Sequence, residues 1–201
     1  SVAALKSKLV DDLPKVILYR VNAGNQPDDH WVHDPEVGGG RLLGEACHFV
    51  DLCYFLARAK VTHASAVPMI SEPQNFDSFT ANLSFSNGSV ASIVYLSNGN
   101  KSLPKEYIEV STGGFSVSID DFKKLSLFGK TTSEKKFPKQ DKGHQKEMEL
   151  VAESLKSGKP FPINIDDVFH STWVTFALLE SAKRNGEQIN ISEFQSEWTS
   201  P

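Results

Sequence analysis

The sequence has few cysteines, nearly balanced charge and no apolar run long enough to cross a bilayer. Its two cysteines, Cys47 and Cys53, lie six residues apart in an apolar segment that we expect to be helical, where their side chains point to opposite sides of the helix. They therefore cannot form a disulfide with each other. Two free thiols, together with an N-terminus that has no charged and apolar leader, lead us to expect a cytoplasmic protein with no membrane anchor.

An excess of charge of one sign is also lacking. The chain has 21 Lys and Arg residues against 25 Asp and Glu residues, for a net charge of −4, and the basic residues form no stripe. A nucleic acid partner requires such a stripe to neutralise its phosphates, so we expect no nucleic acid binding. The 201 residues are 39% hydrophobic, which suffices for a core without disulfide or metal support. We therefore expect a single domain over residues 1–201.

Several motifs that mark common enzyme classes are missing. No G-x-G-x-x-G follows a strand and no G-x-x-x-x-G-K-[ST] occurs, so the chain has no fingerprint for binding a dinucleotide or a nucleoside triphosphate. It also lacks the G-x-S-x-G elbow that marks many serine hydrolases. His30, His33 and Asp34 are the best candidates for metal ligands, but no further ligand follows at a diagnostic spacing, and we expect no metal site.

Helical and extended patterns alternate in the N-terminal part of the chain. Residues 1–10 show a helical apolar pattern without a capping residue or a preceding strand, so we expect the sequence to begin inside a larger protein. Residues 15–21 predict a strand, and residues 22–36 predict a loop rich in Asn, Gly, Pro and Asp. Residues 41–59 contain no proline and are apolar on most sides, which predicts a core helix buried on more than one face.

The middle of the chain shows the alternation of apolar and polar residues that is typical of strands. Asn87-Gly88 favours a type I′ hairpin turn, and Gly113-Gly114 indicates a second turn. The predicted strands span residues 79–86, 90–96, 107–111, 115–119 and 124–128.

Two helices are predicted after these strands. One lies between residues 143 and 157, and the other runs to residue 185 from Asp166 or Asp167, either of which can act as its N-cap. Separate runs of strands and helices favour an α+β fold, in which helices pack on one face of an open, mostly antiparallel sheet. The other face is then free for water or for a partner subunit. Depending on register, Leu83, Phe85 and Ile93 expose or bury an apolar surface on this sheet, and an uncovered apolar face predicts a homo-oligomer.

A polar stripe interrupts the apolar surface of the core helix. With ~100° per residue, this stripe falls within an arc of roughly 120° and comprises Arg41, Gly44, Glu45, His48 and Asp51. One interpretation is a solvated helix face, or a core histidine hydrogen-bonded to an acidic neighbour, and composition alone favours that interpretation. The alternative is that the stripe faces a pocket.

Residues that precede the helix favour the pocket interpretation. Gly38, Gly39 and Gly40 place bare backbone before the helix N-terminus, whose N–H groups and dipole favour an anionic or hydroxyl-rich ligand. His30 and Trp31 add an imidazole and an aromatic ring on the loop leading to that end. Histidine has an ordinary pKa of about 6.5, so His48 can exchange protons at neutral pH, and the acidic residues of the stripe can orient it.

These residues together resemble a known family. Asn22-Ala-Gly-Asn, His30-Trp31, Asp34-Pro35 and the string over residues 38–51 resemble the opening of the C-terminal domain of the Gfo/Idh/MocA oxidoreductases, the glucose-fructose oxidoreductase and inositol dehydrogenase family. The resemblance implies a glyceraldehyde-3-phosphate dehydrogenase-like C-terminal domain, which supplies a substrate pocket and a sheet for homo-oligomerisation. It also implies an N-terminal Rossmann domain, absent from this chain, that binds NAD or NADP.

The resemblance assigns roles to individual residues. His48 occupies the position of a family histidine that lies near the substrate hydroxyl. The family often has Asp four residues earlier, where this chain has Gly44, so the proton relay uses Glu45 or a Glu-Lys-Pro lysine of the nucleotide domain. The implied substrates are sugars, nucleotide sugars and inositol-like polyols. The expected substrate-binding residues are Asn22, His30, Trp31, Gly39, Gly40, Arg41 and Asp51.

Two functional hypotheses remain open at this point. In the first, the full-length protein is an NAD(P)-dependent dehydrogenase or reductase, and this chain alone is inactive. In the second, the domain is a non-catalytic module for sugar binding or assembly, which the glycine at position 44 makes conceivable.

Overall fold

The computed structural model describes residues 9, 13–27, 29–34, 36–70, 76–140 and 142–199. The expected helix over residues 1–10 lies, apart from residue 9, outside these ranges. The strands are β1 (Val16–Asn22), β2 (Val61–Pro68), β3 (Phe79–Phe85), β4 (Val90–Leu96), β5 (Glu106–Thr112), β6 (Phe115–Asp120), β7 (Lys124–Phe128), β8 (Thr132–Lys136) and β9 (Ile189–Asn190). The helices are the 3-10 helix η1 (Trp31–His33) and the α-helices α2 (Gly40–Ala57), α3 (His144–Ser157), α4 (Ile165–Lys183) and α5 (Ile191–Thr199).

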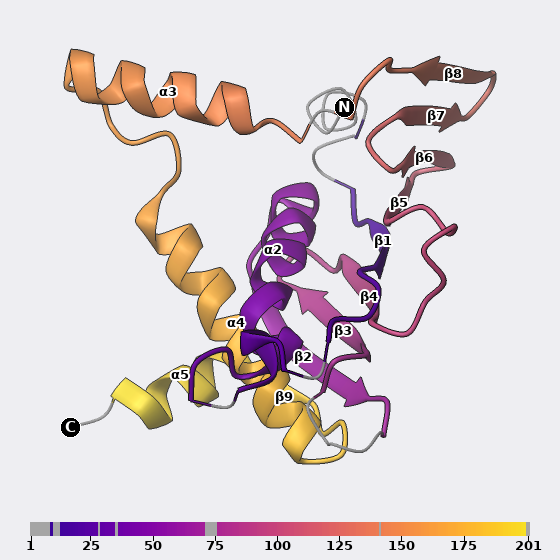
Figure 1. Cartoon of the computed structure of the whole chain (residues 1–201). Helices are drawn as coiled ribbons and strands as arrows, with labels where there is room; N and C mark the ends of the chain where they lie inside the picture. Colours follow the sequence, from indigo (N-terminus) through magenta and orange to yellow (C-terminus); the bar gives the residue numbers. More distant parts are fainter. Residues whose placement is uncertain are drawn as a thin grey trace.

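All of these strands belong to one sheet, in the order β8-β7-β6-β5-β1-β4-β3-β2-β9 (Figure 1). β1 and β4 are parallel, and the other neighbouring pairs are antiparallel. Helices α2 and α4 pack against each other and cover one face of the central strands (Figure 1). The predicted α+β class and the open, mostly antiparallel sheet are confirmed.

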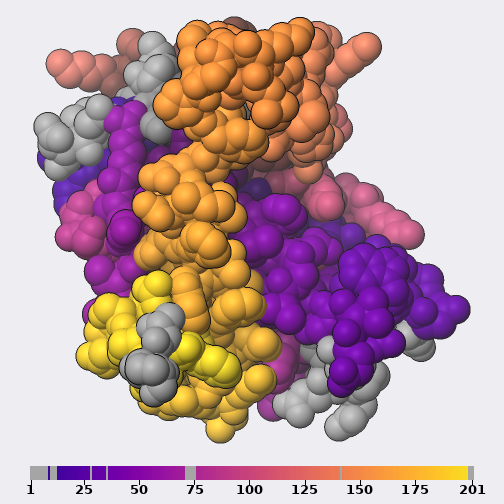
Figure 2. Space-filling view, turned by 90° about the vertical axis from the view of Figure 1, so that its left-hand side faces the viewer, coloured from indigo at the N-terminus to yellow at the C-terminus, as the bar shows by residue number. Residues whose placement is uncertain are grey.

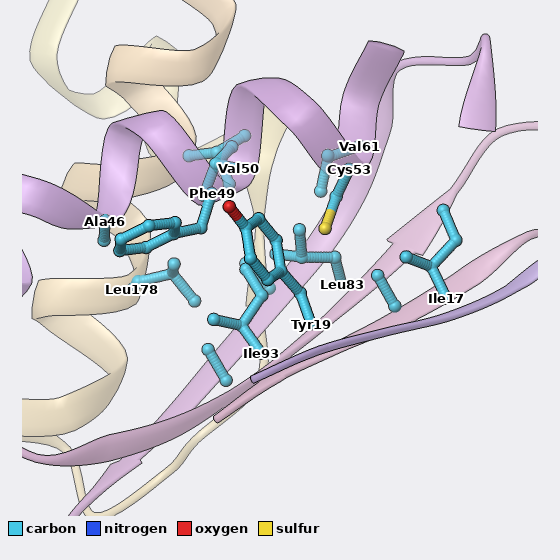
Figure 3. Packing of buried hydrophobic residues seen from close by; sticks show 14 of the residues in the cluster. Ile17, Tyr19, Ala46, Phe49, Val50, Cys53, Val61, Leu83, Ile93 and Leu178 are labelled. Carbon is cyan, nitrogen blue, oxygen red and sulfur yellow. The ribbon is translucent and has the colours of Figure 1, made fainter. Parts of the chain in front are cut away.

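The core lies between this sheet face and the two helices. Tyr19 rises from β1 toward α2, and its ring meets Phe49 edge-on at 5.2 Å between centroids (Figure 3). Leu83, Phe85 and Ile93 are buried and belong to the same apolar cluster, so they point toward the helices. The side chains of the residues that alternate with them along β3 and β4 therefore lie on the opposite face of the sheet.

The hairpin between β3 and β4 has a different turn from the predicted type I′. The Gly88 N–H donates to the Phe85 carbonyl at 3.0 Å, and Gly88 has a φ of 81° while Asn87 does not have a positive φ. This is a type I turn followed by a glycine bulge. The Asn87 side chain explains the difference, because its Nδ2 donates to the Ala57 carbonyl at the end of α2 and its Oδ1 accepts from the Ser89 N–H. A tertiary contact thus selects the turn type. At Gly113-Gly114 both φ angles are positive, as a type I′ turn requires.

The N-cap of α4 also differs from the prediction. Asn164 precedes the helix with extended backbone angles, and its Oδ1 accepts from the Asp166 N–H at 3.1 Å. Asp166 and Asp167 therefore lie inside the first turn instead of capping it. Their carboxylates interact favourably with the positive end of the helix dipole there.

Helix α3 projects from the body of the molecule (Figures 1 and 2). No residue of α3 is buried, although Met148 and Leu155 are apolar. Exposed apolar side chains continue into the start of α4 with Ile165 and Phe169. Among the helices that the structure describes, none has the length and apolarity needed to span a bilayer.

Candidate functional site

A pocket of about 510 Å³ opens beside α2 and contains three of the predicted residues. Glu45, His48 and Asp51 line it from successive turns of the helix. Tyr19 of β1 and Glu106 of β5 line it from the sheet. The polar stripe of the core helix therefore faces a pocket that is large enough for a small polar ligand.

The carboxyl group of Asp51 lies between the pocket and α4. Ser171 donates a hydrogen bond to its Oδ1 at 3.5 Å. Partial burial against α4 raises the pKa of Asp51, and the nearby carboxylate of Asp167 adds to the rise, whereas Ser171 and His48 oppose it. Asp51 therefore holds a proton more readily than an ordinary aspartate, beside the histidine that we expect to exchange protons.

The sheet wall of the pocket carries an ion pair that sequence reasoning missed. Glu106 is buried, and its two carboxylate oxygens accept hydrogen bonds from the Tyr19 hydroxyl and from the Lys142 ammonium group. Lys142 also lies over the ring of Phe122, with its Nζ atom 5.4 Å from the ring centroid. Burial and the neighbouring Glu106 charge raise the pKa of Tyr19 well above its ordinary value, so its hydroxyl stays protonated and acts as a donor.

Strand alternation contains a signal for Glu106. Ile108 and Val110 are buried on the same face of β5, and the period of two extends this face back to Glu106. The predicted strand began one residue later, at Tyr107, so this buried acid was overlooked. Lys142 has no such signal, because it lies in the connection before α3.

Arg41 lies beneath the helical stripe and does not line the pocket. Its side chain is 1% exposed, and its Nη1 donates to the Tyr95 hydroxyl at 2.9 Å. The same nitrogen is 4.0 Å from Glu45, one turn further along α2. The Nε and Nη2 atoms of Arg41 are buried without a hydrogen-bond partner among the described residues. Arg41 thus places a positive charge next to Glu45.

The three glycines before α2 have distinct structural roles. Gly39 and Gly40 have φ angles of 66° and 84°, which favour glycine. A Cβ atom on Gly38 would lie 2.5 Å from the Cα of Val32, so only glycine fits there. The N–H groups of Gly38 and Gly39 both donate to the Asp34 carbonyl. These two N–H groups are therefore used within the chain.

The side chains of His30 and Trp31 lie at η1, and neither lines the His48 pocket. His30 caps η1, because its Nδ1 accepts from the Val32 N–H at 3.3 Å. Trp31 is 61% exposed, and its ring lies 5.5 Å from the His30 ring. The structure therefore leaves Trp31 available on the surface near the start of α2.

The carboxylate of Asp77 lies at the N-terminus of α2. It is 3.1 Å from the Nδ1 atom of His33 and accepts the Arg41 N–H at 3.4 Å. A protein carboxylate thus takes the position at this helix end that the sequence suggested for an anionic ligand.

Asn22 is buried and positions a loop. Its Nδ2 donates to the carbonyl groups of Asn100 at 2.8 Å and Leu103 at 3.0 Å. Asn22 lines a second cleft of about 560 Å³, which is distinct from the His48 pocket.

No group of three or more His, Cys, Asp and Glu side chains in the described part of the chain is arranged to hold a metal ion. Cys53 is fully buried, which raises its pKa to about 12, and burial also raises the pKa of Cys47. Neither thiol has the lowered pKa of an activated nucleophile.

Residues 14–111 match the family model of the GFO/IDH/MocA C-terminal domain, over the strand and core helix that build the pocket. The chain is therefore similar to this family over those residues. The resemblance seen in residues 22–51 is thereby confirmed. None of the curated protein sequences matches the chain.

Solved structures share the fold of this chain. An aldose-aldose oxidoreductase from Caulobacter crescentus, complexed with glycerol, matches with a TM-score of 0.76 and 15% identity over 94% of this chain and 58% of its own. An oxidoreductase from Agrobacterium radiobacter, in complex with NAD+, L-tartaric acid and magnesium, has a TM-score of 0.71 and 15% identity over 95% of this chain and 60% of its own. The UDP-N-acetylglucosamine 3-dehydrogenase of Acidithiobacillus ferrooxidans has a TM-score of 0.73 and 14% identity, and the match covers 91% of this chain and 57% of that protein. The chain thus spans 57–60% of the length of these three proteins.

Proposed function

We propose that this chain is the substrate-binding domain of an NAD- or NADP-dependent oxidoreductase acting on a sugar, a nucleotide sugar or an inositol-like polyol. The observation that carries the proposal is that Glu45, His48 and Asp51 line one pocket of about 510 Å³. The family assignment and the sugar and nucleotide-sugar oxidoreductases of the same fold support it.

The residues of this pocket suit the alcohol side of the reaction. His48 accepts the proton of the substrate hydroxyl in oxidation, or returns it in reduction, since an imidazole exchanges protons near neutral pH. Glu45 and Asp51 lie one turn to either side of it on α2 and can receive that proton or orient the ring. Arg41 donates a hydrogen bond to the Tyr95 hydroxyl and lies 4.0 Å from Glu45, so its charge helps to position the Glu45 carboxylate.

The same pocket does not fit a dinucleotide. None of its lining residues belongs to a glycine-rich phosphate-binding loop, and the Lys142 ammonium group that lines it is already paired with Glu106. The nicotinamide, which exchanges the hydride when it is bound, is therefore assigned to a Rossmann domain outside this chain. In this proposal residues 1–201 form one substrate domain of a cytoplasmic two-domain enzyme.

The open sheet face is the proposed surface for homo-oligomerisation. Val16 and Leu18 of β1 and Val90 of β4 are exposed apolar residues in adjacent strands. Burying such a surface against a second copy is favourable. Light scattering at tens of micromolar tests this part of the proposal, and a strictly monomeric mass contradicts it.

The central test is His48→Ala in the full-length protein that contains this domain. We expect kcat/KM for the sugar-like substrate to fall by at least about 100-fold, because a positioned acid or base contributes that much. His63→Ala is the matched control, since His63 lies on β2 and does not line the pocket. A loss of less than about threefold in His48→Ala contradicts the proposal. Sugar binding without any nicotinamide-dependent absorbance change would instead support a non-catalytic module.

A further inference from the structure

Helix α3 has no packing partner that could account for its stability. None of its residues is buried, and the helix stands away from α2 and α4 (Figure 1). An isolated helix shorter than about 12–15 residues is only marginally stable in water, and α3 has 14 residues. A stable α3 therefore requires a partner surface, which the described part of the chain does not supply.

One side of α3 is apolar and open. His144, Met148, Val151 and Leu155 follow one another at helical spacing and fall within an arc of ~60°. We call these four residues the α3 stripe. The side chains of Met148 and Leu155 are 62% and 76% exposed. The stripe is thus the face of an amphipathic helix whose apolar side is uncovered.

The opposite side of α3 has the properties of a water-facing surface. Its two central carboxylates are paired with nearby lysines, Glu149 with Lys146 at 3.5 Å and Glu153 with Lys159 at 2.8 Å. All four side chains are more than half exposed. Charges that are paired with one another in this way need no further partner, so a docking partner of α3 is expected on the stripe.

The apolar surface continues beyond the end of α3. The connection over residues 158–164 leads to α4 and lines a hollow of about 700 Å³. Phe161, Ile163 and Ile165 line this hollow and are exposed. Exposed apolar side chains that follow one another along a connection and two helices mark an interaction surface more often than scattered single residues do.

The α3 stripe begins at the His48 pocket, because His144 is both the first residue of the helix and part of the pocket lining. Hydride transfer requires the reacting atoms of the substrate and the nicotinamide to lie about 3–3.5 Å apart. In the proposed function a domain outside this chain holds the nicotinamide, so that domain must stand against the opening of this pocket. A second copy of this chain in the same place would block the nicotinamide. The surface that adjoins the pocket therefore suits the nucleotide-binding domain.

We propose that the α3 stripe and the adjoining apolar connection are the docking surface for the nucleotide-binding domain of the same protein. The inference rests on the proposed function and adds to it the surface that holds the two domains together. Burial of Met148 and Leu155 against that domain supplies the partner that α3 lacks. The same contact fixes His144 and Lys142 at the pocket, so that docking also completes the pocket wall.

Photo-cross-linking in the full-length protein tests which surface covers α3. Leu155 is replaced by the photoreactive residue p-benzoylphenylalanine, and the cross-linked peptides are identified by mass spectrometry. We expect a cross-link within one chain, to a peptide outside residues 1–201. The matched control carries the same photoreactive residue in place of Glu153, which lies on the opposite side of the helix. The yield of this cross-link should be at least about tenfold lower in the control.

Hydrogen exchange provides a second measurement on the full-length protein. In Met148→Lys/Leu155→Lys we expect the α3 amides to exchange at least about tenfold faster than in the wild type, whereas exchange in α2 stays unchanged. Lysine has nearly the same helix propensity as methionine and leucine, so faster exchange reports lost docking and not a weaker helix. Glu149→Gln/Glu153→Gln is the control for changes on the other side of α3.

Three results would overturn the proposal: a cross-link to a second copy of the chain, equal cross-linking at positions 155 and 153, or unchanged α3 exchange in the lysine variant. A cross-link between copies would assign the surface to oligomerisation. The proposed function is tested separately, because His48→Ala leaves the cross-link intact whether or not it lowers kcat/KM. An active enzyme without the cross-link contradicts only the docking surface, and a cross-link with no effect of His48→Ala contradicts only the proposed role of the pocket.

Discussion

The Tyr19 hydroxyl donates a hydrogen bond to Glu106, which lies 87 residues further along the chain. Tyr19 belongs to β1 and Glu106 to the neighbouring strand β5, so this contact joins two adjacent strands at the wall of the candidate pocket. Lys142 completes the arrangement from the connection to α3. A buried carboxylate thus links the sheet to the segment that closes one side of the pocket.

Lys142→Met tests the structural importance of this link. Removing the ammonium group leaves Glu106 buried with an uncompensated charge, which costs about 3–5 kcal/mol in a fully buried pair. Lys142 is itself partly exposed, so we expect a smaller loss of about 1–3 kcal/mol in the free energy of unfolding, measured in urea.

The double variant Lys142→Met/Glu106→Gln provides the control for that measurement. Glu106→Gln removes the charge that needs compensation while keeping an acceptor for Tyr19. If the pair acts as described, the double variant is more stable than Lys142→Met alone. Equal stabilities of the single and double variants would contradict this account.

A pair of glycine substitutions tests the start of α2. In Gly38→Ala the new Cβ would lie 2.5 Å from the Val32 Cα and 2.6 Å from the Trp31 carbonyl oxygen, so backbone must move. We expect a loss of about 2–4 kcal/mol in the free energy of unfolding. Gly44→Ala is the matched control, because the nearest atom is 3.7 Å away and alanine is the better helix former by about 0.5–1 kcal/mol. A stable Gly38→Ala variant would refute the predicted clash.

Elements with strong local periodicity were predictable from the sequence. The core helix was expected at residues 41–59 and is α2 (Gly40–Ala57). It ends earlier because Arg58, which still donates its N–H to the Tyr54 carbonyl at 2.9 Å, adopts a left-handed conformation that takes the chain out of the helix. The alternation over residues 79–96 likewise matches β3 and β4. Local backbone preferences and one buried face suffice for such elements.

The parts of the site that depend on distant residues were not predictable in this way. Helical spacing placed Glu45 and His48 on one face, but it gave no sign that Arg41 lies under Tyr95, which is 54 residues away. The ion pair of Glu106 with Lys142 likewise depends on the path of the chain across the sheet. Strand register and connection geometry decide these contacts, and neither is encoded in a short sequence window.

Tyr95→Phe tests how much the buried guanidinium group of Arg41 depends on its hydrogen bond to Tyr95. Tyr95 is completely buried, and its hydroxyl accepts from Arg41, which has two other nitrogens without partners among the described residues. Losing a hydrogen bond to a charged group costs about 1.5–3 kcal/mol, and we expect a destabilisation in this range. Tyr107→Phe is the control, because its hydroxyl donates to Glu109 at a half-buried position. A smaller effect for Tyr95→Phe than for this control would contradict the expectation.

His170 makes the stability of the α2–α4 region depend on pH. Its Nε2 accepts the Val61 N–H at 2.9 Å, which requires a neutral ring. Burial and the nearby Lys60 charge lower the pKa of His170, and Asp167 only partly opposes them. Because the folded-state pKa lies below the unfolded value near 6.5, the contribution of His170 is present above pH 6.5 and is lost as the pH falls through the lowered pKa. We therefore expect His170→Gln to reduce the loss of unfolding free energy between pH 7.5 and pH 5, measured by urea denaturation at each pH. An unchanged pH dependence in the variant would show that His170 is protonated equally in the folded and unfolded chains.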